Sequence, residues 1–192
     1  AVALGGIVVD GGTFDWAGAG YTGLSRPDPS YHGLSYTETF GKAAYIVKAR
    51  VQLMRDMGFA PSPMNAFLTN MGLETLHLRM QRHSENAQKV AEFLAGQKKI
   101  VSVKYPGLSG DADYARAQKY LGGRASGVIS FEMSSRDEAV AFMNKLKMIA
   151  IVVHVADVRS GILHPASSTH RQLSDAELVA AGIKPGTMRL SV

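Results

Sequence analysis

The second half of the chain alternates short runs typical of strands with runs typical of helices. The strand-type runs, which are apolar or alternate apolar with polar residues, lie at 100–105, 127–133, 148–155 and 187–192. Helix-type runs at 136–147 and 174–182 separate the later strands. Each helix begins at a serine followed three residues later by a glutamate, which is the pattern of a capping box (Ser135 with Glu138, Ser174 with Glu177). This alternation predicts a compact α/β unit over residues 98–192.

The first half predicts mostly helix. Apolar residues recur every fourth position from Tyr45 to Met57, which predicts a helix over 42–57 that ends at a left-handed Gly58. A second helical pattern covers 64–97, with Met71 and Gly72 as its expected interruption. The apolar residues 2–9 predict a buried strand. Residues 13–41 have no periodicity, but their five aromatic side chains indicate a packed segment rather than a disordered one.

Composition narrows the functional classes. The 192 residues contain no cysteine, which excludes disulfides and thiolate metal sites. The net charge is +5, but the basic residues are scattered, so we interpret them as a solvated surface rather than a nucleic-acid interface. No apolar run has the length of a membrane span and no signal peptide is recognisable, so we expect a cytoplasmic protein. An apolar beginning without Met and an end inside a predicted strand suggest a piece of a longer protein.

Arg189 is the strongest single candidate for ligand binding. Side chains alternate faces along a strand, so Met188, Leu190 and Val192 share one face, and Arg189 lies on the other face with two hydroxyl residues. A guanidinium in this position could bind a carboxylate through two parallel N–H groups. The alternative is a surface arginine that covers the sheet.

The stretch "ILHPASSTHRQL" at 162–173 leaves three interpretations open: a nucleophile with its base, a metal site, or a loop that shapes a pocket. His154, His164 and His170 are spaced by ten and six residues, which matches no compact zinc motif. Ser167 or Ser168 with His170 would make a nucleophilic pair, but no G-x-S-x-G turn is present. We predict that His83, on the apolar side of a helix, is a hydrogen-bonded core residue. The early glycine pairs do not form a dinucleotide-binding loop.

Four segments together carry a family resemblance. They are "GGIVVDGGTFDW", "PSPMNAFLTNMGLETLHLRMQRHSENAQKVAEFL", "VKYPGL" and "VHVADVRSGILHPASSTHRQL…GIKPGTMRLSV". They resemble the C-terminal half of the pyridoxal-phosphate (PLP) enzymes of cysteine and methionine metabolism. The resemblance implies an α/β fragment of the PLP-dependent transferase (aspartate aminotransferase-like) fold. Residues 1–75 would complete the large cofactor-binding domain, and 76–192 would form most of the small C-terminal domain.

The same resemblance assigns the site. It implies that Arg189 binds the substrate α-carboxylate, that Ser160 contacts the substrate and that Thr169 supports the cleft from behind, with "HPASSTH" as a wall of that cleft. The family more often has leucine where this chain has Gly161, which puts neighbouring contacts in doubt. The resemblance places the lysine that binds PLP upstream of Ala1. It therefore implies no catalytic residue, no PLP binding and no activity for these 192 residues alone.

For the whole enzyme, the resemblance implies a γ-replacement that makes homocysteine or methionine from O-acetylhomoserine and sulfide or a thiol. It also implies a homo-oligomer built as a dimer of dimers, with no nucleic-acid or membrane partner. The long aromatic segment at 13–41 favours the sulfhydrylase branch. A cystathionine γ-synthase, a methionine γ-lyase and a non-catalytic α/β binding or assembly module remain as alternatives.

Overall fold

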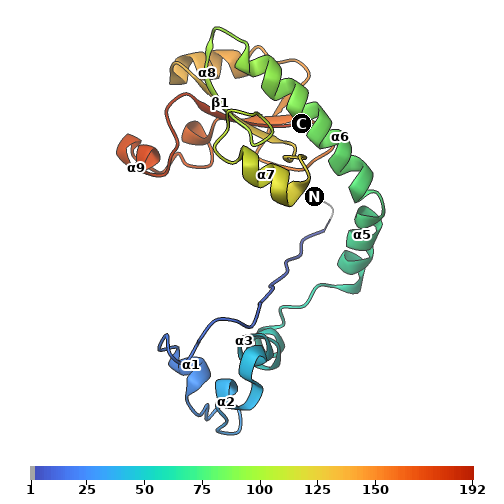
Figure 1. The fold of residues 1–192 in the computed structure, drawn as a ribbon, viewed down its shortest axis with the longest axis vertical. Helices are drawn as coiled ribbons and strands as arrows, with labels where there is room; N and C mark the ends of the chain where they lie inside the picture. The colour runs from blue at the N-terminus through green and yellow to red at the C-terminus, as the bar shows by residue number, and fades with distance from the viewer. Residues whose placement is uncertain (1–2) are drawn as a thin grey trace. The chain divides into compact units, whose positions relative to one another are not determined.

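The computed structural model describes residues 3–192 and divides into two compact units, Ala1–Met71 and Gly72–Val192 (Figure 1). The boundary lies within helix α5 (Pro63–Glu74), a few residues before the domain boundary predicted at residue 75. The assignment of the two segments to the large and small domains of an enzyme stays a prediction. None of the helices formed by residues 3–192 is both long and apolar enough to cross a membrane.

The first unit consists of short helical segments. They are α1 (Thr22–Ser25), α2 (Tyr36–Phe40), the 3₁₀ turn η1 (Gly41–Ala43), α3 (Ala44–Lys48), the π-helical η2 (Ala49–Met54) and α4 (Arg55–Met57). The segments from η1 to α4 follow one another without a gap, and Gly58 then takes a left-handed conformation with φ of 71°. The predicted helix over 42–57 and its glycine end are therefore confirmed.

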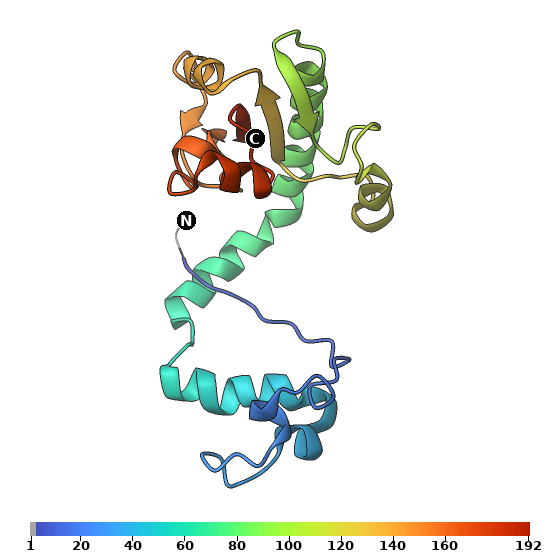
Figure 2. The same ribbon diagram turned by 90° about the vertical axis from the view of Figure 1, so that its left-hand side faces the viewer.

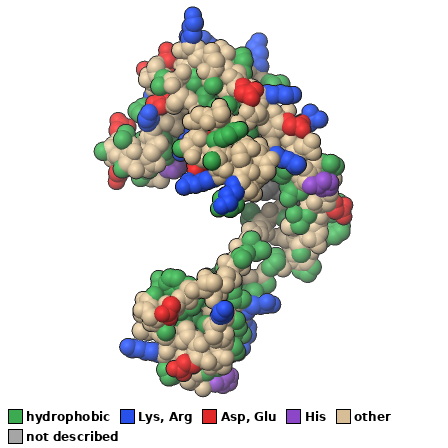
Figure 3. Space-filling model, in the orientation of Figure 1, with side chains coloured by type: hydrophobic (Ala, Val, Ile, Leu, Met, Phe, Trp, Pro, Cys, Tyr) green, Lys and Arg blue, Asp and Glu red, His purple; other side chains and the backbone are tan. Residues whose placement is uncertain are grey.

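Aromatic side chains form the core of the first unit. Tyr36 is fully buried, and Tyr31 stacks on it with ring centroids 5.7 Å apart. Trp16 stacks on Tyr45 at 5.1 Å and meets Phe14 edge-on at 4.6 Å. The prediction that the aromatic residues of 13–41 pack rather than remain disordered is confirmed. Other apolar side chains stay exposed on this unit, among them Leu53, Met57 and Phe59, as the green atoms in the lower part of Figure 3 illustrate.

The predicted strand at 2–9 is wrong for the residues that the structure describes. Residues 3–9 form no strand, and Leu4, Ile7 and Val9 are 83%, 88% and 82% exposed. A strand needs a neighbour to accept and donate its backbone hydrogen bonds. Within residues 3–192 no strand pairs with this run, so its apolar pattern alone does not produce a sheet.

The second unit is built on a five-stranded sheet in the order β1-β2-β5-β4-β3. The strands are β1 (Ile100–Lys104), β2 (Val128–Met133), β3 (Ala150–Ile151), β4 (Gly161–Leu163) and β5 (Thr187–Ser191). All neighbours pair antiparallel except β3 with β4, which are parallel. The other segments are α6 (Leu76–Ala95), α7 (Tyr114–Leu121), α8 (Arg136–Met143), the 3₁₀ turn η3 (Pro165–Ser167) and α9 (Asp175–Ala180).

Apolar residues from β2 and β5 form the centre of the core in the second unit. Ile129, Phe131 and Met133 are buried on β2, and Met188 and Leu190 are buried on β5. Helix α6 contacts β1 and β2, and α8 contacts β2 and β5 (Figures 1 and 2). The alternating pattern predicted for 127–133 is confirmed, and it fixes which face of the sheet the helices cover.

The starts of helices α8 and α9 lie at the predicted serine caps, whereas the predicted end of α8 is wrong. Ser174 and Glu177 form a complete capping box at α9. At α8 the Ser135 hydroxyl accepts from the Glu138 amide at 3.2 Å, but the Glu138 carboxylate accepts from the Ser134 hydroxyl, so the box is half formed. Helix α8 ends at Met143 rather than at 147. The long helical pattern of 64–97 is interrupted at Thr75, between α5 and α6, rather than at Met71 and Gly72.

The strand predicted at 148–155 shrinks to the two residues of β3. Ala150 and Ile151 pair with Gly161 and Ile162, and the Val152 amide still donates to the Ile162 carbonyl at 3.1 Å. In this parallel register Ala150 already lies opposite Gly161, where β4 begins, so residues 148 and 149 have no partner in β4. After Val152 the chain leaves the sheet, and residues 153–160 form the rest of a loop that starts at 152 and leads into β4.

Candidate functional site: the Arg189 strand and the 152–160 loop

Strand β5 holds Arg189 in the middle of the sheet. It pairs with Ser130 of β2 on one side and with Leu163 of β4 on the other. Its neighbours Met188 and Leu190 are buried in the core, so strand alternation directs Arg189 to the opposite face, where it is half-buried. The predicted orientation of Arg189 is confirmed.

The Arg189 side chain is anchored at one point. Its Nη2 donates to the Val153 carbonyl at 2.7 Å, and Val153 belongs to the 152–160 loop. A guanidinium has five N–H groups in a fixed plane. Within residues 3–192 no Asp or Glu forms an ion pair with Arg189. The anchored guanidinium therefore keeps donors for a carboxylate from outside the described chain.

The acidic residue of the loop, Asp157, pairs with Arg159 and not with Arg189. Asp157 accepts from Arg159 Nη2 at 3.1 Å and from Arg159 Nε at 3.3 Å, and its Oδ1 also accepts from the Arg159 amide at 2.9 Å. These bonds to Arg159 lower the pKa of Asp157 to about 2, and the same pairing raises the pKa of Arg159. Both oxygens of the Asp157 carboxylate are thus satisfied within the loop, which leaves Arg189 without this competitor.

Ser160 lies at the end of the loop, immediately before β4. It lines a small cavity of about 110 Å³ together with Ala150, Val152, His154, Asp157, Arg159 and Gly161. No hydrogen bond joins Ser160 to Arg189 within residues 3–192. Leu163, the partner of Arg189, is three residues after Ser160, so about 10 Å of strand separates the two positions. The two residues predicted to contact the substrate therefore do not touch each other.

Gly161 sets the spacing between β3 and β4. A Cβ atom at this position would lie 2.6 Å from Cγ2 of Val152, which is closer than real Cβ contacts come. The side chain of Val152 therefore occupies the space that a larger residue 161 would need. This close approach was not visible in the sequence, where Gly161 only stood out as a departure from leucine.

The segment "HPASSTH" is held in place by the buried side chain of His164. His164 is 1% exposed; its Nε2 lies 2.7 Å from the Pro185 carbonyl and its Nδ1 lies 2.8 Å from the Ser167 hydroxyl. A carbonyl only accepts, so Nε2 is the donor in the bond to Pro185. The serine–histidine contact thus involves His164, whereas the sequence suggested His170. Both nitrogens are used, and within residues 3–192 no three acidic or histidine side chains gather around a common point.

The remaining predicted residues have local partners. The exposed Thr169 hydroxyl lies 2.9 Å from Nδ1 of His170, and no contact links it to Arg189 or Ser160 among residues 3–192. Its supporting role stays a prediction. His83 Nδ1 lies 2.6 Å from the Val192 carbonyl, so the hydrogen-bonded histidine is confirmed, although it is half-buried rather than fully buried.

Sequence reasoning missed the parts of the site that depend on the loop. The Val153 carbonyl that holds Arg189 carries no side-chain signal. The Asp157–Arg159 pair could have been found, because opposite charges two residues apart in a Gly- and Ser-flanked segment often form a local ion pair.

The geometry defines an α/β unit that presents an arginine without a carboxylate partner among residues 3–192 on a central strand. Residues 4–192 match the sequence profile described as Cys/Met metabolism PLP-dependent enzyme. The chain therefore belongs to the family of PLP-dependent enzymes of cysteine and methionine metabolism.

Curated relatives extend this likeness over almost the whole chain. It is 46% identical to the O-acetyl-L-homoserine sulfhydrylase of Leptospira meyeri over 99% of its own length and 45% of that protein. It is 45% identical to O-acetyl-L-homoserine sulfhydrylase 1 of Thermus thermophilus over 98% of its length and 45% of that protein. The chain thus spans about 45% of the length of these relatives.

Two solved structures share the fold. A Campylobacter jejuni protein assigned as an O-acetylhomoserine (thiol)-lyase, crystallised with N′-pyridoxyl-lysine-5′-monophosphate, matches 89% of this chain with a TM-score of 0.79 and 40% identity, over 41% of its own length. O-acetylhomoserine sulfhydrylase of Wolinella succinogenes matches 90% of the chain with a TM-score of 0.64 and 30% identity, over 44% of its own length. The expected fold class, part of a PLP-dependent transferase fold, is confirmed.

Proposed function

We propose that the protein containing this chain makes homocysteine from O-acetylhomoserine and sulfide by PLP-dependent γ-replacement. Two findings support this proposal. The chain belongs to the family, and relatives named O-acetyl-L-homoserine sulfhydrylase match nearly its whole length. A thiol in place of sulfide would give methionine by the same chemistry. The activity belongs to the whole protein, and we expect the 192-residue chain alone to be inactive.

The role proposed for this chain, substrate binding, rests on one observation. The guanidinium of Arg189 is anchored by a backbone carbonyl and has no carboxylate partner among residues 3–192. The Val153 carbonyl fixes one N–H of the side chain at 2.7 Å, so the planar group is oriented before a substrate arrives. The substrate α-carboxylate would accept two parallel hydrogen bonds from the free N–H groups. An oriented guanidinium loses less conformational freedom on binding, which favours both affinity and correct positioning.

Ser160, at the end of the 152–160 loop, would add a hydrogen bond from its neutral hydroxyl to the substrate. It lies beyond the Asp157–Arg159 pair, and its side of the loop faces the small cavity next to Gly161. We assign Ser160 a substrate contact weaker than that of Arg189, because a hydrogen bond to a neutral hydroxyl contributes less than a charge-assisted one. Thr169 would act only by supporting the segment around His170.

Pyridoxal phosphate, when bound, supplies the electron sink for the bond changes at the substrate carbons. The residues described around Arg189 suit the carboxylate of the amino-acid substrate and not the cofactor: the cavity beside Ser160 is lined by no lysine. We therefore assign no residue of this chain to hold the cofactor. The contribution of the chain is to bind and orient the substrate.

Assembly and compartment follow from the resemblance and are part of the proposal. We propose a homo-oligomer built as a dimer of dimers that acts in the cytoplasm, with no nucleic-acid or membrane partner. Light scattering on the full-length protein would test the assembly: a monomer at micromolar concentration would contradict it.

The choice of sulfur donor tests the reaction. Full-length protein loaded with PLP should convert O-acetylhomoserine and sulfide to homocysteine, and should make little cystathionine when cysteine replaces sulfide. A preference for cysteine would indicate a cystathionine γ-synthase, and release of methanethiol from methionine would indicate a methionine γ-lyase. Absence of all three activities in cofactor-loaded protein would support the non-catalytic alternative and refute the proposal.

A further inference from the structure

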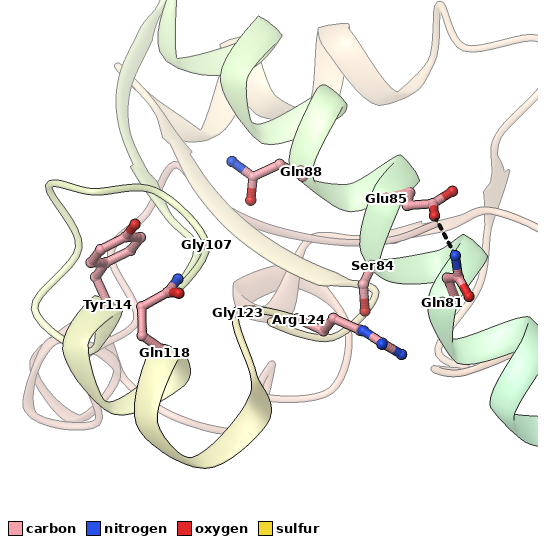
Figure 4. Close-up of a pocket in the computed structure, with 9 residues that line it drawn as sticks. All are labelled: Gln81, Ser84, Glu85, Gln88, Gly107, Tyr114, Gln118, Gly123 and Arg124. Atoms are coloured by element: carbon pink, nitrogen blue, oxygen red, sulfur yellow. Dashed lines mark hydrogen bonds between the residues drawn. The ribbon is translucent and has the colours of Figure 1, made fainter.

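A cavity of about 360 Å³, lined mainly by residues with polar side chains, lies beside α6 and α7 in the second unit (Figure 4). Four lining residues come from α6 and two from α7, and the remainder belong to the turns next to them. The lining residues are Gln81, Ser84, Glu85, Gln88, Gly107, Tyr114, Gln118, Gly123 and Arg124. No residue assigned to the Arg189 site is among them, so the cavity is a separate feature of this unit.

Glycines keep the cavity open. A Cβ atom on Gly107 would lie 2.1 Å from Oε1 of Gln88 and 2.5 Å from the ring of Tyr105. Gly123 has φ of +77°, which a residue with a side chain rarely adopts, and its position faces the Gln118 amide. Larger residues at either position would displace the amide side chains that form the walls.

One wall offers hydrogen-bond acceptors. Gln88 donates its Nε2 to Glu92 at 2.7 Å, which leaves its Oε1 on the side of Gly107. Gln81 donates its Nε2 to Oε1 of Glu85 at 2.9 Å, so the Gln81 Oε1 is left as an acceptor. The carboxylate of Glu85 adds a negative charge that is only loosely balanced by Arg82 at 3.8 Å. Amide oxygens beside a carboxylate favour an ammonium group.

Two further lining residues, Arg124 and the α6 residue Ser84, offer hydrogen-bond donors. Arg124 lines the cavity, and within residues 3–192 no carboxylate pairs with it. Ser84 is only 7% exposed, and its hydroxyl makes no hydrogen bond within residues 3–192, although its carbonyl accepts from Tyr105. In Figure 4 the Ser84 hydroxyl points toward the side of the cavity on which Arg124 lies. The Ser84 hydroxyl is not sealed inside the protein but reaches the cavity, so it can donate a hydrogen bond to a ligand there.

We propose that this cavity is a second binding site, separate from the Arg189 site, for a small zwitterionic α-amino acid. Arg124 and Ser84 would bind the carboxylate, and Gln88, Gln81 and Glu85 would bind the ammonium group. Tyr114 and Gln118 also line the cavity, and their polar groups would favour a side chain with an amide or hydroxyl. The volume is within the usual range of small-molecule sites.

Isothermal titration calorimetry of the full-length protein with L-glutamine tests the proposal. The wild type should bind, and Arg124→Gln should weaken binding roughly tenfold to hundredfold because a charge-assisted bond to carboxylate is lost. Arg116→Gln is the matched control, since Arg116 is exposed on the same helix region and pairs with Asp113 at 2.6 Å. Its affinity should equal that of the wild type. N-acetyl-L-glutamine, which lacks the ammonium group, should bind at least tenfold more weakly.

Further variants separate this site from the substrate site. Gln88→Leu should weaken L-glutamine binding like Arg124→Gln, while Arg189→Lys should leave it unchanged, and circular dichroism should show each variant folded. Lack of binding to the wild type at millimolar L-glutamine would overturn the proposal. So would equal binding to wild type and Arg124→Gln, or a loss confined to Arg189→Lys, which would place the ligand at the substrate site. Neither result would affect the γ-replacement activity assigned above.

Discussion

Gly161→Ala probes the link between the sheet and the position of Arg189. The added Cβ would lie 2.6 Å from Cγ2 of Val152 and needs about 1 Å more for ordinary contact. Valine has little freedom at χ1, so the side chain cannot simply rotate away. The main chain at 152 must move, and the next residue, Val153, provides the carbonyl that holds Arg189 at 2.7 Å.

The expected magnitudes follow from these contacts. Overpacking of this kind costs about 1–3 kcal/mol of stability. Loss of the bond between Val153 and the Arg189 guanidinium would remove orientation rather than charge, so the guanidinium could still bind a carboxylate. We therefore expect KM for O-acetylhomoserine to rise about threefold to tenfold, which corresponds to about 0.7–1.4 kcal/mol. The kcat should fall less, because no group that contacts the reacting atoms is removed.

A double-mutant cycle provides the control. Val152→Ala removes the methyl group that the new Cβ would strike, so Gly161→Ala combined with Val152→Ala should recover most of the lost KM and stability. Steady-state kinetics and thermal unfolding of the four proteins give the coupling. If the double variant were as impaired as the sum of the single variants, the Val152 contact would not transmit the effect and the reasoning would fail.

Three further predictions use other parts of the second unit. Ser174→Ala should lower stability by about 1 kcal/mol through loss of the α9 capping box, measured by denaturant unfolding; an unchanged midpoint would contradict it. Because pairing with Arg159 lowers the pKa of Asp157, the ionised carboxylate stabilises the fold above its ordinary pKa of 3.8, and this contribution is lost as the pH falls toward 2. The difference in melting temperature between wild type and Asp157→Asn should therefore shrink over that pH range. A difference that stays constant would refute the pairing. Ser160→Ala should raise KM for O-acetylhomoserine by less than tenfold, and a larger loss in kcat than in KM would give Ser160 a different role.

Local signals predicted the parts of the fold that depend on neighbours in sequence. The Gly58 helix end, the Ser174 capping box and the alternation of Ile129, Phe131 and Met133 each involve residues within one or two turns or one strand. Such patterns are determined by backbone geometry, so they can be read without knowing the tertiary structure.

Features that depend on distant partners were predicted less well. The apolar run at 3–9 has the composition of a strand but no pairing neighbour within residues 3–192, and the run at 148–155 is strand only where β4 lies beside it. The side-chain face of Arg189 followed from alternation, whereas its anchor is a backbone carbonyl that any residue at 153 would supply. The sequence therefore predicted the face on which Arg189 lies, but not the backbone carbonyl that orients its side chain.

The most direct test of the account is the conservative substitution Arg189→Lys in the full-length, PLP-loaded protein. Lysine keeps the charge but offers a point charge on a flexible stem in place of two parallel donors. We predict a loss of roughly tenfold to hundredfold in kcat/KM for O-acetylhomoserine with sulfide, with cofactor content by absorbance equal to that of the wild type. Wild-type kinetics, or a loss of pyridoxal phosphate in place of substrate affinity, would contradict the assignment of Arg189 as the residue that binds the substrate carboxylate.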